Sequence, residues 1–303
     1  MAFPFFKPIT LSLIIFSLFY APMAMAQDKY SAVGKFVGGQ SLSQLWELSE
    51  EHEQGTFVVT PYRPIYFMMA KYSNDMNENP KSVSLSNSLE QPIGYDNIEA
   101  AFQISLKTKV FHNILWNKAD LWLAYTQSAF HQIYNKPISR PMRELNYEPE
   151  LILNVPMRFR VLGFTGRMAG VSLNHVSNGR DLPLSRSWNR IIFHVALEHK
   201  NWQVYLRSWV RLQSMEDNNP KINDYLGRGD IRILKDIGNH RLTFIGQHSL
   251  NFAENRGSAR LDWTFPIRKN LNGYLRAFHG YGESLIDYNH TQTTVGFGIS
   301  LID

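Results

Sequence analysis

The stretch Glu150–Arg160, with the sequence ELILNVPMRFR, carries the pattern that decides the fold. Its apolar residues recur at every second position: Leu151, Leu153, Val155, Met157 and Phe159. Asn154, Arg158 and Arg160 fall between them. Because side chains alternate between the two faces of a strand, the stretch predicts a β-strand with one apolar and one polar face.

The same alternation recurs along the chain from about residue 57 onward, in segments separated by Asn, Gly, Asp and Pro clusters. Helical periodicity is hard to find. Counting the segments gives about twelve predicted strands, at residues 57–72, 99–111, 119–133, 146–160, 163–177, 187–198, 201–213, 228–236, 240–251, 257–265, 271–281 and 291–301. An even number of strands lets both termini lie on one side of a barrel.

A sheet of this kind forms either a soluble sandwich or a membrane barrel. The segments have about ten residues each, which suits a tilted membrane crossing. Their polar faces carry bulky Arg, Gln and Glu side chains that can pair inside a closed lumen. Aromatic residues occur near segment ends, where interfacial girdles are expected: Tyr62, Tyr66, Trp188, Trp202, Tyr281 and Tyr288. We therefore predict an all-β fold, a twelve-stranded antiparallel transmembrane β-barrel over residues 57–303.

The N-terminus predicts export. Lys7 is followed by an apolar run at 9–21 and by Ala24-Met25-Ala26, a small-x-small cleavage site. We interpret residues 1–26 as a signal peptide and residues 27–56 as a periplasmic N-terminal segment with room for one short helix.

Composition excludes several other classes of protein. Hydrophobic residues make up 44% of the 303 positions, but no later segment has the roughly 18 consecutive apolar residues of a membrane helix. The net charge of +5 is spread along the chain, which argues against nucleic acid as a partner. Cysteine is absent, so thiolate catalysis, zinc-thiolate sites and disulfides are excluded.

Polar residues interrupt one apolar face. Val171 and Leu173 are followed on the same face by His175 and Ser177, and across the next turn Asn189 begins a similar face. Polar groups that face hydrocarbon lose water without compensation, so they are costly unless they pair. Ser as nucleophile, His as general base and Asn as the residue that orients the imidazole form a hydrolytic triad. The alternative is a polar loop at the end of a strand.

Four motifs closely resemble the bacterial outer-membrane phospholipase A family: His175–Arg180 (HVSNGR), Ser185–Arg190 (SRSWNR), Asn146–Pro149 (NYEP) and Gly280–Asn289 (GYGESLIDYN). This family is a twelve-stranded barrel. The resemblance implies that Ser177 is the nucleophile, His175 the proton acceptor and Asn189 the third member, and that the backbone N–H of Gly179 contributes to the oxyanion hole.

The resemblance also implies a calcium ion bound between two subunits. Arg180, through its carbonyl, and Ser185 would come from one subunit and Ser139 from the other, since Ca²⁺ accepts such oxygens. A further calcium position in the monomer maps to Asp217. Gln127, on an apolar face with Leu121, Leu123 and Tyr125, matches a residue at the dimer interface of the family.

The resemblance predicts a calcium-dependent hydrolase of acyl esters of phospholipids and lysophospholipids, that is, a phospholipase A1/A2 and lysophospholipase. It would be activated by homodimerisation in the outer membrane of a Gram-negative bacterium. Two alternatives stay open: a passive structural or channel barrel with an inactive site, and a barrel that modifies the acyl chains of lipopolysaccharide without calcium or a dimer.

Overall fold

The computed structural model describes residues 39–213, 217–268 and 271–302. The predicted signal peptide lies outside the described residues, as does the first part of the predicted N-terminal segment. The described strand segments are β1 (Val59–Pro61), β2 (Ile65–Ser73), β3 (Ile98–Asn113), β4 (Ala119–His131), β5 (Met142–Val161), β6 (Phe164–Ser177), β7 (Ser187–His199), β8 (Trp202–Leu212), β9 (Gly229–Ile237), β10 (His240–His248), β11 (Gly257–Arg268), β12 (Leu271–Tyr281) and β13 (Thr291–Ile302).

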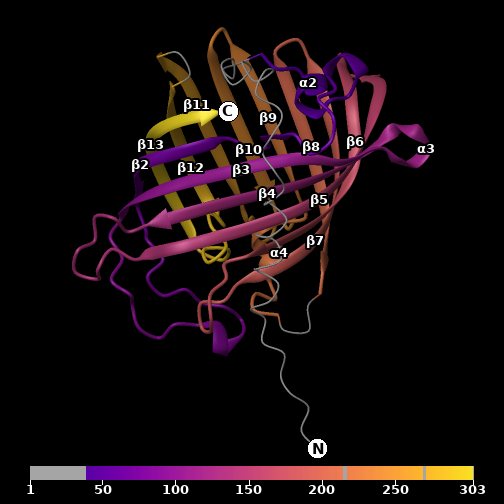
Figure 1. Ribbon diagram of the computed structural model, residues 1–303. Helices are drawn as coiled ribbons and strands as arrows, with labels where there is room; N and C mark the ends of the chain where they lie inside the picture. Colours follow the sequence, from indigo (N-terminus) through magenta and orange to yellow (C-terminus); the bar gives the residue numbers. More distant parts are fainter. Residues whose placement is uncertain (1–38, 214–216, 269–270, 303) are drawn as a thin grey trace, which may run out of the picture. The chain divides into compact units, whose positions relative to one another are not determined.

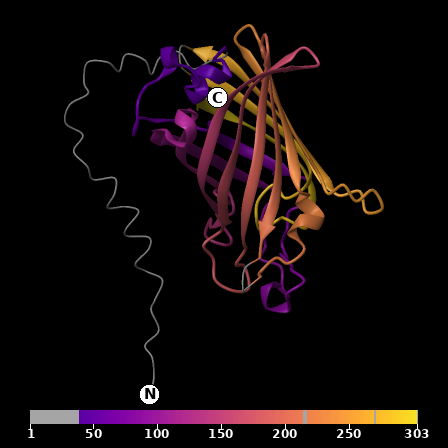
Figure 2. The same cartoon turned by 90° about the vertical axis from the view of Figure 1, so that its right-hand side faces the viewer.

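These segments form one closed antiparallel barrel (Figure 1, Figure 2). Each strand from β2 to β12 pairs with the next one, and β13 returns to pair with β2. β1 and β2 both pair with β3, β1 opposite Leu106–Thr108 and β2 opposite Ile98–Gln103, so together they occupy one position in the ring. The prediction of twelve strand positions is therefore confirmed.

Two predicted strands are less regular than the sequence pattern indicates. The predicted strand at 57–72 is interrupted at residues 62–64, where Pro64 has no N–H to donate to a ladder. In β5 the alternation of the Glu150–Arg160 stretch holds to Val155, and a register shift follows between Pro156 and Phe159. Beyond it β5 pairs only with β6, because the pairing of β5 with β4 ends at Asn154, whereas β6 still pairs with β7.

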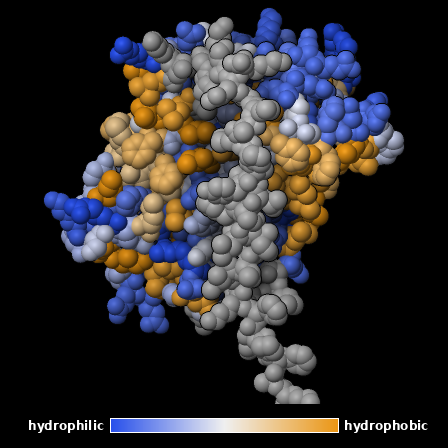
Figure 3. Space-filling model, in the orientation of Figure 1, coloured by the Kyte–Doolittle hydropathy of each residue, from blue (hydrophilic) through white to orange (hydrophobic). Residues whose placement is uncertain are grey.

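The two faces of the barrel wall differ as the alternation predicts. Large apolar side chains such as Leu173, Phe193 and Phe297 are about half exposed on the outside. On the face seen in Figure 3, hydrophobic side chains cover much of the visible wall. The lumen holds buried ion pairs, among them Lys71 with Glu99 at 2.9 Å. Many charged side chains thus form ion pairs inside the barrel, as expected for a narrow polar lumen.

The two ends of the barrel carry different connections. Short turns join β5 to β6, β7 to β8 and β9 to β10, whereas longer loops occupy 74–97, 132–141 and 178–186. In bacterial outer-membrane barrels the short turns are periplasmic and the longer loops extracellular. β6 runs toward the long-loop end, so His175 and Ser177 lie near that end.

The described helices are α2 (Leu42–Trp46), α3 (Ile114–Lys118) and α4 (Ile222–Leu226), with 3₁₀ turns at Glu50–His52 and Leu85–Asn87. Figure 1 shows α2 among the short turns, whereas α4 lies at the other end of the barrel. Within the described ranges, no helix is both long and apolar enough to cross a membrane.

Residues 39–56, which we call the lumen plug, close the short-turn end from the inside. A capping box of Ser41 and Gln44 starts α2. Leu42 and Trp46 of α2 are buried in one cluster with Trp122 and Ile152 of the barrel wall. The Leu42 N–H donates to Glu198, and Glu47 pairs with Lys109 at 3.0 Å. The predicted short helix of this segment is present, and it packs into the barrel.

Candidate active site

Strands β6 and β7 bring His175 and Asn189 together. The two residues are directly opposite each other in the antiparallel ladder, so their side chains share the outward face. The His175 Nδ1 and Asn189 Oδ1 atoms are 2.7 Å apart. Because the amide oxygen accepts, Nδ1 carries the proton and Nε2 keeps a free lone pair. The imidazole is thereby held in the tautomer that a general base requires.

Ser177, the last residue of β6, lies two positions beyond His175 on the same face. Side chains at this spacing are about 7 Å apart along a strand. No hydrogen bond joins Ser177 Oγ to His175 among the described residues, so the two side chains must lean together for proton transfer. Catalytic hydrogen bonds are commonly long in structures without substrate.

The three residues lie on the lipid-facing wall. Leu173 and Phe193, on the same face of β6 and β7, are each 53% exposed. On the lumen side, Val176, Trp188 and Trp209 belong to one buried cluster. The site therefore has an apolar surface around it and a packed support behind it.

Gly179 follows Ser177 in a backbone conformation that favours glycine, with φ of +62°. A Cβ at this position would lie 3.1 Å from Cε2 of Tyr147. Its backbone N–H makes no hydrogen bond within the described part of the chain and is therefore available to an oxyanion. A free backbone N–H two residues beyond the candidate nucleophile is the kind of donor that an oxyanion hole uses.

The loop at 178–186 is closed by its own hydrogen bonds. The N–H of Asn178 donates to the carbonyl of Arg186 at 3.1 Å, and the N–H of Arg186 donates to Asn178 Oδ1 at 3.0 Å. Burial lowers the pKa of the Arg186 guanidinium, which donates to the carbonyls of Pro183 and Ser185. These contacts fix the backbone that carries Gly179.

A buried carboxylate, which sequence reasoning did not identify, supports this loop from inside the barrel. Glu144 accepts hydrogen bonds from Asn178 at 3.3 Å, from Asn146 at 2.6 Å and from the Ile286 N–H at 3.1 Å. Asn146 in turn accepts from the Leu285 N–H at 3.0 Å. Two of the quoted motifs, at 146–149 and 280–289, thus meet behind the candidate site. Asn146 was visible in its motif, whereas nothing in the local pattern marks Glu144.

Two of the residues implied as calcium ligands lie in the loop at 178–186. The Arg180 carbonyl accepts no hydrogen bond in the described ranges, and the Arg180 guanidinium donates to the Arg143 carbonyl. Ser185 Oγ accepts from Asn218 at 3.0 Å and keeps a second lone pair. These two oxygens suit a hard cation.

The other two implied ligands are placed differently. Asp217 is paired with Arg211 and also accepts from the Asn219 N–H at 3.1 Å, so its carboxylate is already engaged. Ser139 is exposed in the loop between β4 and β5. Within the described residues, no group of three or more His, Asp or Glu side chains forms a metal site. A calcium site here would thus depend on hydroxyl and carbonyl oxygens.

Gln127 lies on the outward face of β4. It accepts a hydrogen bond from the hydroxyl of Tyr125 at 3.3 Å, and Leu123 and Tyr125 on the same face are 44% and 40% exposed. The amide nitrogen of Gln127 has no hydrogen-bond partner among the described residues. The Gln127 amide nitrogen is thus a hydrogen-bond donor without a partner, among the described residues, on an apolar surface.

The chain is similar to several known proteins. Residues 42–301 match the family model described as Phospholipase A1. The phospholipase A1 of Klebsiella pneumoniae is 34% identical, over 92% of this chain and 93% of that protein. The phospholipase A1 of Salmonella typhimurium is 36% identical, over 84% of each.

Two solved structures are also similar. The outer membrane phospholipase A from Escherichia coli superposes with a TM-score of 0.73 at 35% identity, covering 81% of this chain and 94% of that chain. The Salmonella typhi outer membrane phospholipase, a dimer with bound calcium, has a TM-score of 0.73 at 36% identity, with coverage of 83% and 94%.

Proposed function

Because this chain belongs to the phospholipase A1 family, we propose that Ser177, His175 and Asn189 are the residues with which it hydrolyses phospholipid esters. The barrel is an outer-membrane protein, like the relatives that it resembles. The observation that carries the proposal is the 2.7 Å contact between His175 Nδ1 and Asn189 Oδ1 on the lipid-facing wall, next to Ser177.

The residues have separate roles in the proposed reaction. His175 Nε2 takes the proton of Ser177 Oγ while Oγ attacks the ester carbonyl, and the Gly179 N–H donates to the oxygen that becomes negative. His175 then gives the proton to the leaving alcohol, which leaves an acyl group on Ser177. Water, deprotonated by His175, releases the fatty acid and restores the serine. Asn189 keeps the imidazole in one tautomer throughout.

The position of the triad decides how substrate arrives. Ser177 and His175 are on the outer wall near the long-loop end, with exposed apolar side chains toward the middle of the wall. A phospholipid within the leaflet would bring its ester to this level while its acyl chains stay in contact with the wall. No passage through the lumen is needed.

Calcium fits two oxygens of the loop at 178–186. The Arg180 carbonyl and the Ser185 hydroxyl would hold it, whereas the ion pair of Asp217 with Arg211 makes Asp217 a poorer ligand. When bound, a divalent cation here supplies positive charge close to the oxyanion donor Gly179. These two oxygens are fewer than the six to eight that Ca²⁺ takes, and water together with groups from a second copy would complete the set. We therefore include a homodimer in the proposal, with Ser139 supplied by the second copy and Gln127 at the interface.

The test measures fatty-acid release from phospholipid vesicles by the folded protein, with calcium or with a chelator. Ser177→Ala should abolish release. Ser187→Ala is a matched control, because Ser187 faces Ser177 across the ladder and has no assigned role. Phospholipids labelled at one acyl position, together with lysophospholipids, test whether the activity extends to A2 and lysophospholipase reactions.

Each outcome has a distinct meaning. Release that requires calcium and is lost only in Ser177→Ala supports the triad and the calcium assignment. Activity that survives Ser177→Ala refutes the nucleophile. No release by demonstrably folded protein under any condition would instead favour a barrel with an inactive site.

A further inference from the structure

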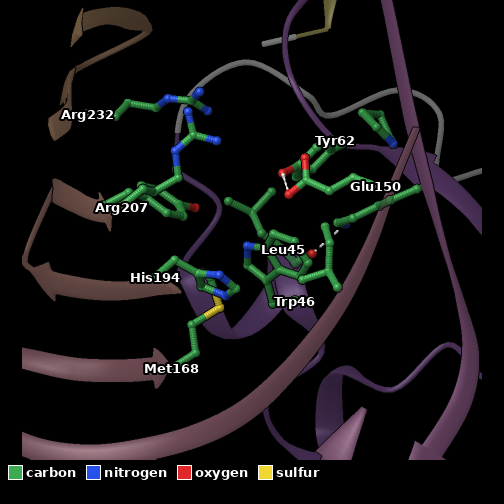
Figure 4. A pocket seen from close by; sticks show the side chains of 12 residues that line it. Leu45, Trp46, Tyr62, Glu150, Met168, His194, Arg207 and Arg232 are labelled. Carbon is green, nitrogen blue, oxygen red and sulfur yellow. Dashed lines mark hydrogen bonds between the residues drawn. The ribbon is translucent and has the colours of Figure 1, made fainter. Parts of the chain in front are cut away.

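A cavity of about 60 Å³ lies inside the barrel, between the lumen plug and the wall. Its lining includes Leu45 and Trp46 of the lumen plug, together with Tyr62, Lys107, Glu150, Arg207 and Arg232 (Figure 4). A cavity needs only about 10–15 Å³ to hold one water molecule. This one therefore has room for a group larger than a single water.

The charges around the cavity do not balance. Lys107, Arg207 and Arg232 line it, and Glu150 is the only carboxylate among the lining residues. The ion-pair partners from outside are Arg63 on Glu150, Glu148 on Arg63 and Asp230 on Arg207. Four cations then face three carboxylates. Buried charge without a counter-charge costs several kcal/mol per ion, so this excess calls for an anion.

Arg232 is the cation with no direct partner. Its guanidinium makes no hydrogen bond or ion pair with any residue in the described ranges, and its Nε is buried without a partner. Arg232 is on β9 and Arg207 on β8, at diagonal positions of the ladder. Figure 4 shows the two guanidinium groups close together on one side of the cavity. Two neighbouring guanidinium groups repel each other unless an anion lies between them.

Glu150 cannot serve as that anion. Its Oε1 accepts from Tyr62 at 3.2 Å and from Ser172 at 2.9 Å, and its Oε2 accepts from Arg63 at 3.2 Å. Figure 4 shows Glu150 and Tyr62 across the cavity from the two arginines. Lys107 donates to the Leu45 carbonyl at 2.7 Å and has no carboxylate partner within the described residues. Lys107 and Arg232 therefore line the cavity without a carboxylate partner among the described residues.

We propose that this cavity binds one small inorganic oxyanion of the phosphate or sulfate class, held between Arg207 and Arg232. Planar guanidinium groups present several N–H donors and bind such oxyanions through paired hydrogen bonds. The ion would join the wall strands β8 and β9 at a point where the lumen plug supplies the facing surface, Leu45 and Trp46. It is a stabilising ligand, separate from the candidate active site on the outer wall.

Thermal unfolding of the full chain in detergent micelles tests the proposal, in phosphate, sulfate, chloride or acetate at matched ionic strength. Phosphate at about ten times its dissociation constant should raise the Tm by about 3 °C. Arg232→Gln should lose this shift. In buffer without oxyanions the variant should be at least as stable as wild type, because the substitution removes an uncompensated charge. Micelles with phosphatidylglycerol in place of phosphate should give no shift, since the cavity lies within the lumen.

Equilibrium dialysis with radioactive phosphate provides a readout independent of stability. Wild type should retain about one phosphate per chain and Arg232→Gln none. Arg158→Gln is the matched control, since Arg158 is exposed on β5 and also has no ion pair in the described residues; it should behave as wild type. Equal retention by Arg232→Gln, no retention by wild type, or an equal Tm shift in chloride would each overturn the proposal.

Discussion

Gln127 and Ser177 lie at the same level of the barrel wall, two strands apart. Tyr147 on β5 is the direct ladder partner of both, of Gln127 on β4 and of Ser177 on β6. Directly opposed residues share a face, so all three point outward. A second barrel that covers Gln127 would therefore also cover the surface beside the nucleophile. This relation connects the proposed dimer to the proposed chemistry.

Gln127→Ala should weaken dimerisation. A polar side chain that finds a partner within the membrane contributes about 1 kcal/mol, which corresponds to a roughly fivefold higher dimer dissociation constant. Sedimentation equilibrium in detergent with calcium measures this change. His279→Ala is the control, because His279 is also polar and exposed on the wall but belongs to β12, four positions from β4 in the ring. Equal weakening by both substitutions would contradict an interface at Gln127.

Gly179→Ala should lower kcat at least tenfold. The residue has φ of +62°, and its new methyl group would approach the Tyr147 ring at 3.1 Å, so the loop must shift and move the N–H donor. Gly163→Ala is matched for backbone conformation, with φ of +82°, but has open space around it. That control should keep full activity. Steady-state kinetics of both variants test this prediction. An unchanged kcat in Gly179→Ala would show that Gly179 is not part of the oxyanion hole.

The sequence predicted the barrel well because alternation reports which face a side chain takes. The predicted strands at 228–236 and 240–251, where Lys235 and the mixed faces around His248 blur the alternation, correspond to β9 and β10. Alternation carries no information about partners. It therefore did not predict that Lys71 on β2 and Glu99 on β3 form a buried ion pair at 2.9 Å. Such pairs depend on strand register, which the local pattern does not give.

For the candidate site, the sequence suggested the proposed triad but not the residues that support it. Polar residues on an apolar face drew attention to His175, Ser177 and Asn189, and the family resemblance supplied their proposed roles. The ladder places His175 opposite Asn189. Glu144 was missed, since a buried carboxylate beside a loop looks like any polar residue near a strand end. The lumen plug was predicted only as a segment with room for a short helix. Its docking depends on contacts such as Glu47 with Lys109, which are 62 residues apart in numbering.

Asn189→Ala should lower kcat about tenfold with little change in KM. The variant removes the acceptor that fixes the His175 tautomer, and that contact matters most as the imidazole takes up the proton. Asn255→Ala is a close control, because Asn255 Oδ1 bonds His248 Nε2 at 3.0 Å at the same end of the barrel. The control should keep wild-type kinetics. If KM rises and kcat does not change, Asn189 positions substrate and not the base.

Asp287→Asn should destabilise the long-loop end in a pH-dependent way. Burial disfavours the Asp287 carboxylate, but the charge of Arg143 at 3.0 Å and a hydrogen bond from Ser284 outweigh burial, so the pKa of Asp287 lies below its usual value. A group whose pKa is lowered on folding contributes stability above its unfolded pKa, about 3.9 for Asp, and loses it as the pH falls further.

At pH 7 the free energy of unfolding of Asp287→Asn should therefore be about 3 kcal/mol smaller than that of wild type, the usual cost of breaking a buried pair. The difference should shrink as the pH falls below about 4. Denaturant unfolding in detergent across this range measures it. Asp75→Asn is the control, because the Asp75 carboxylate is 64% exposed and lies 3.8 Å from His290. A difference between wild type and Asp287→Asn that stays constant with pH would show that the loss comes from packing and not from the charge of Asp287.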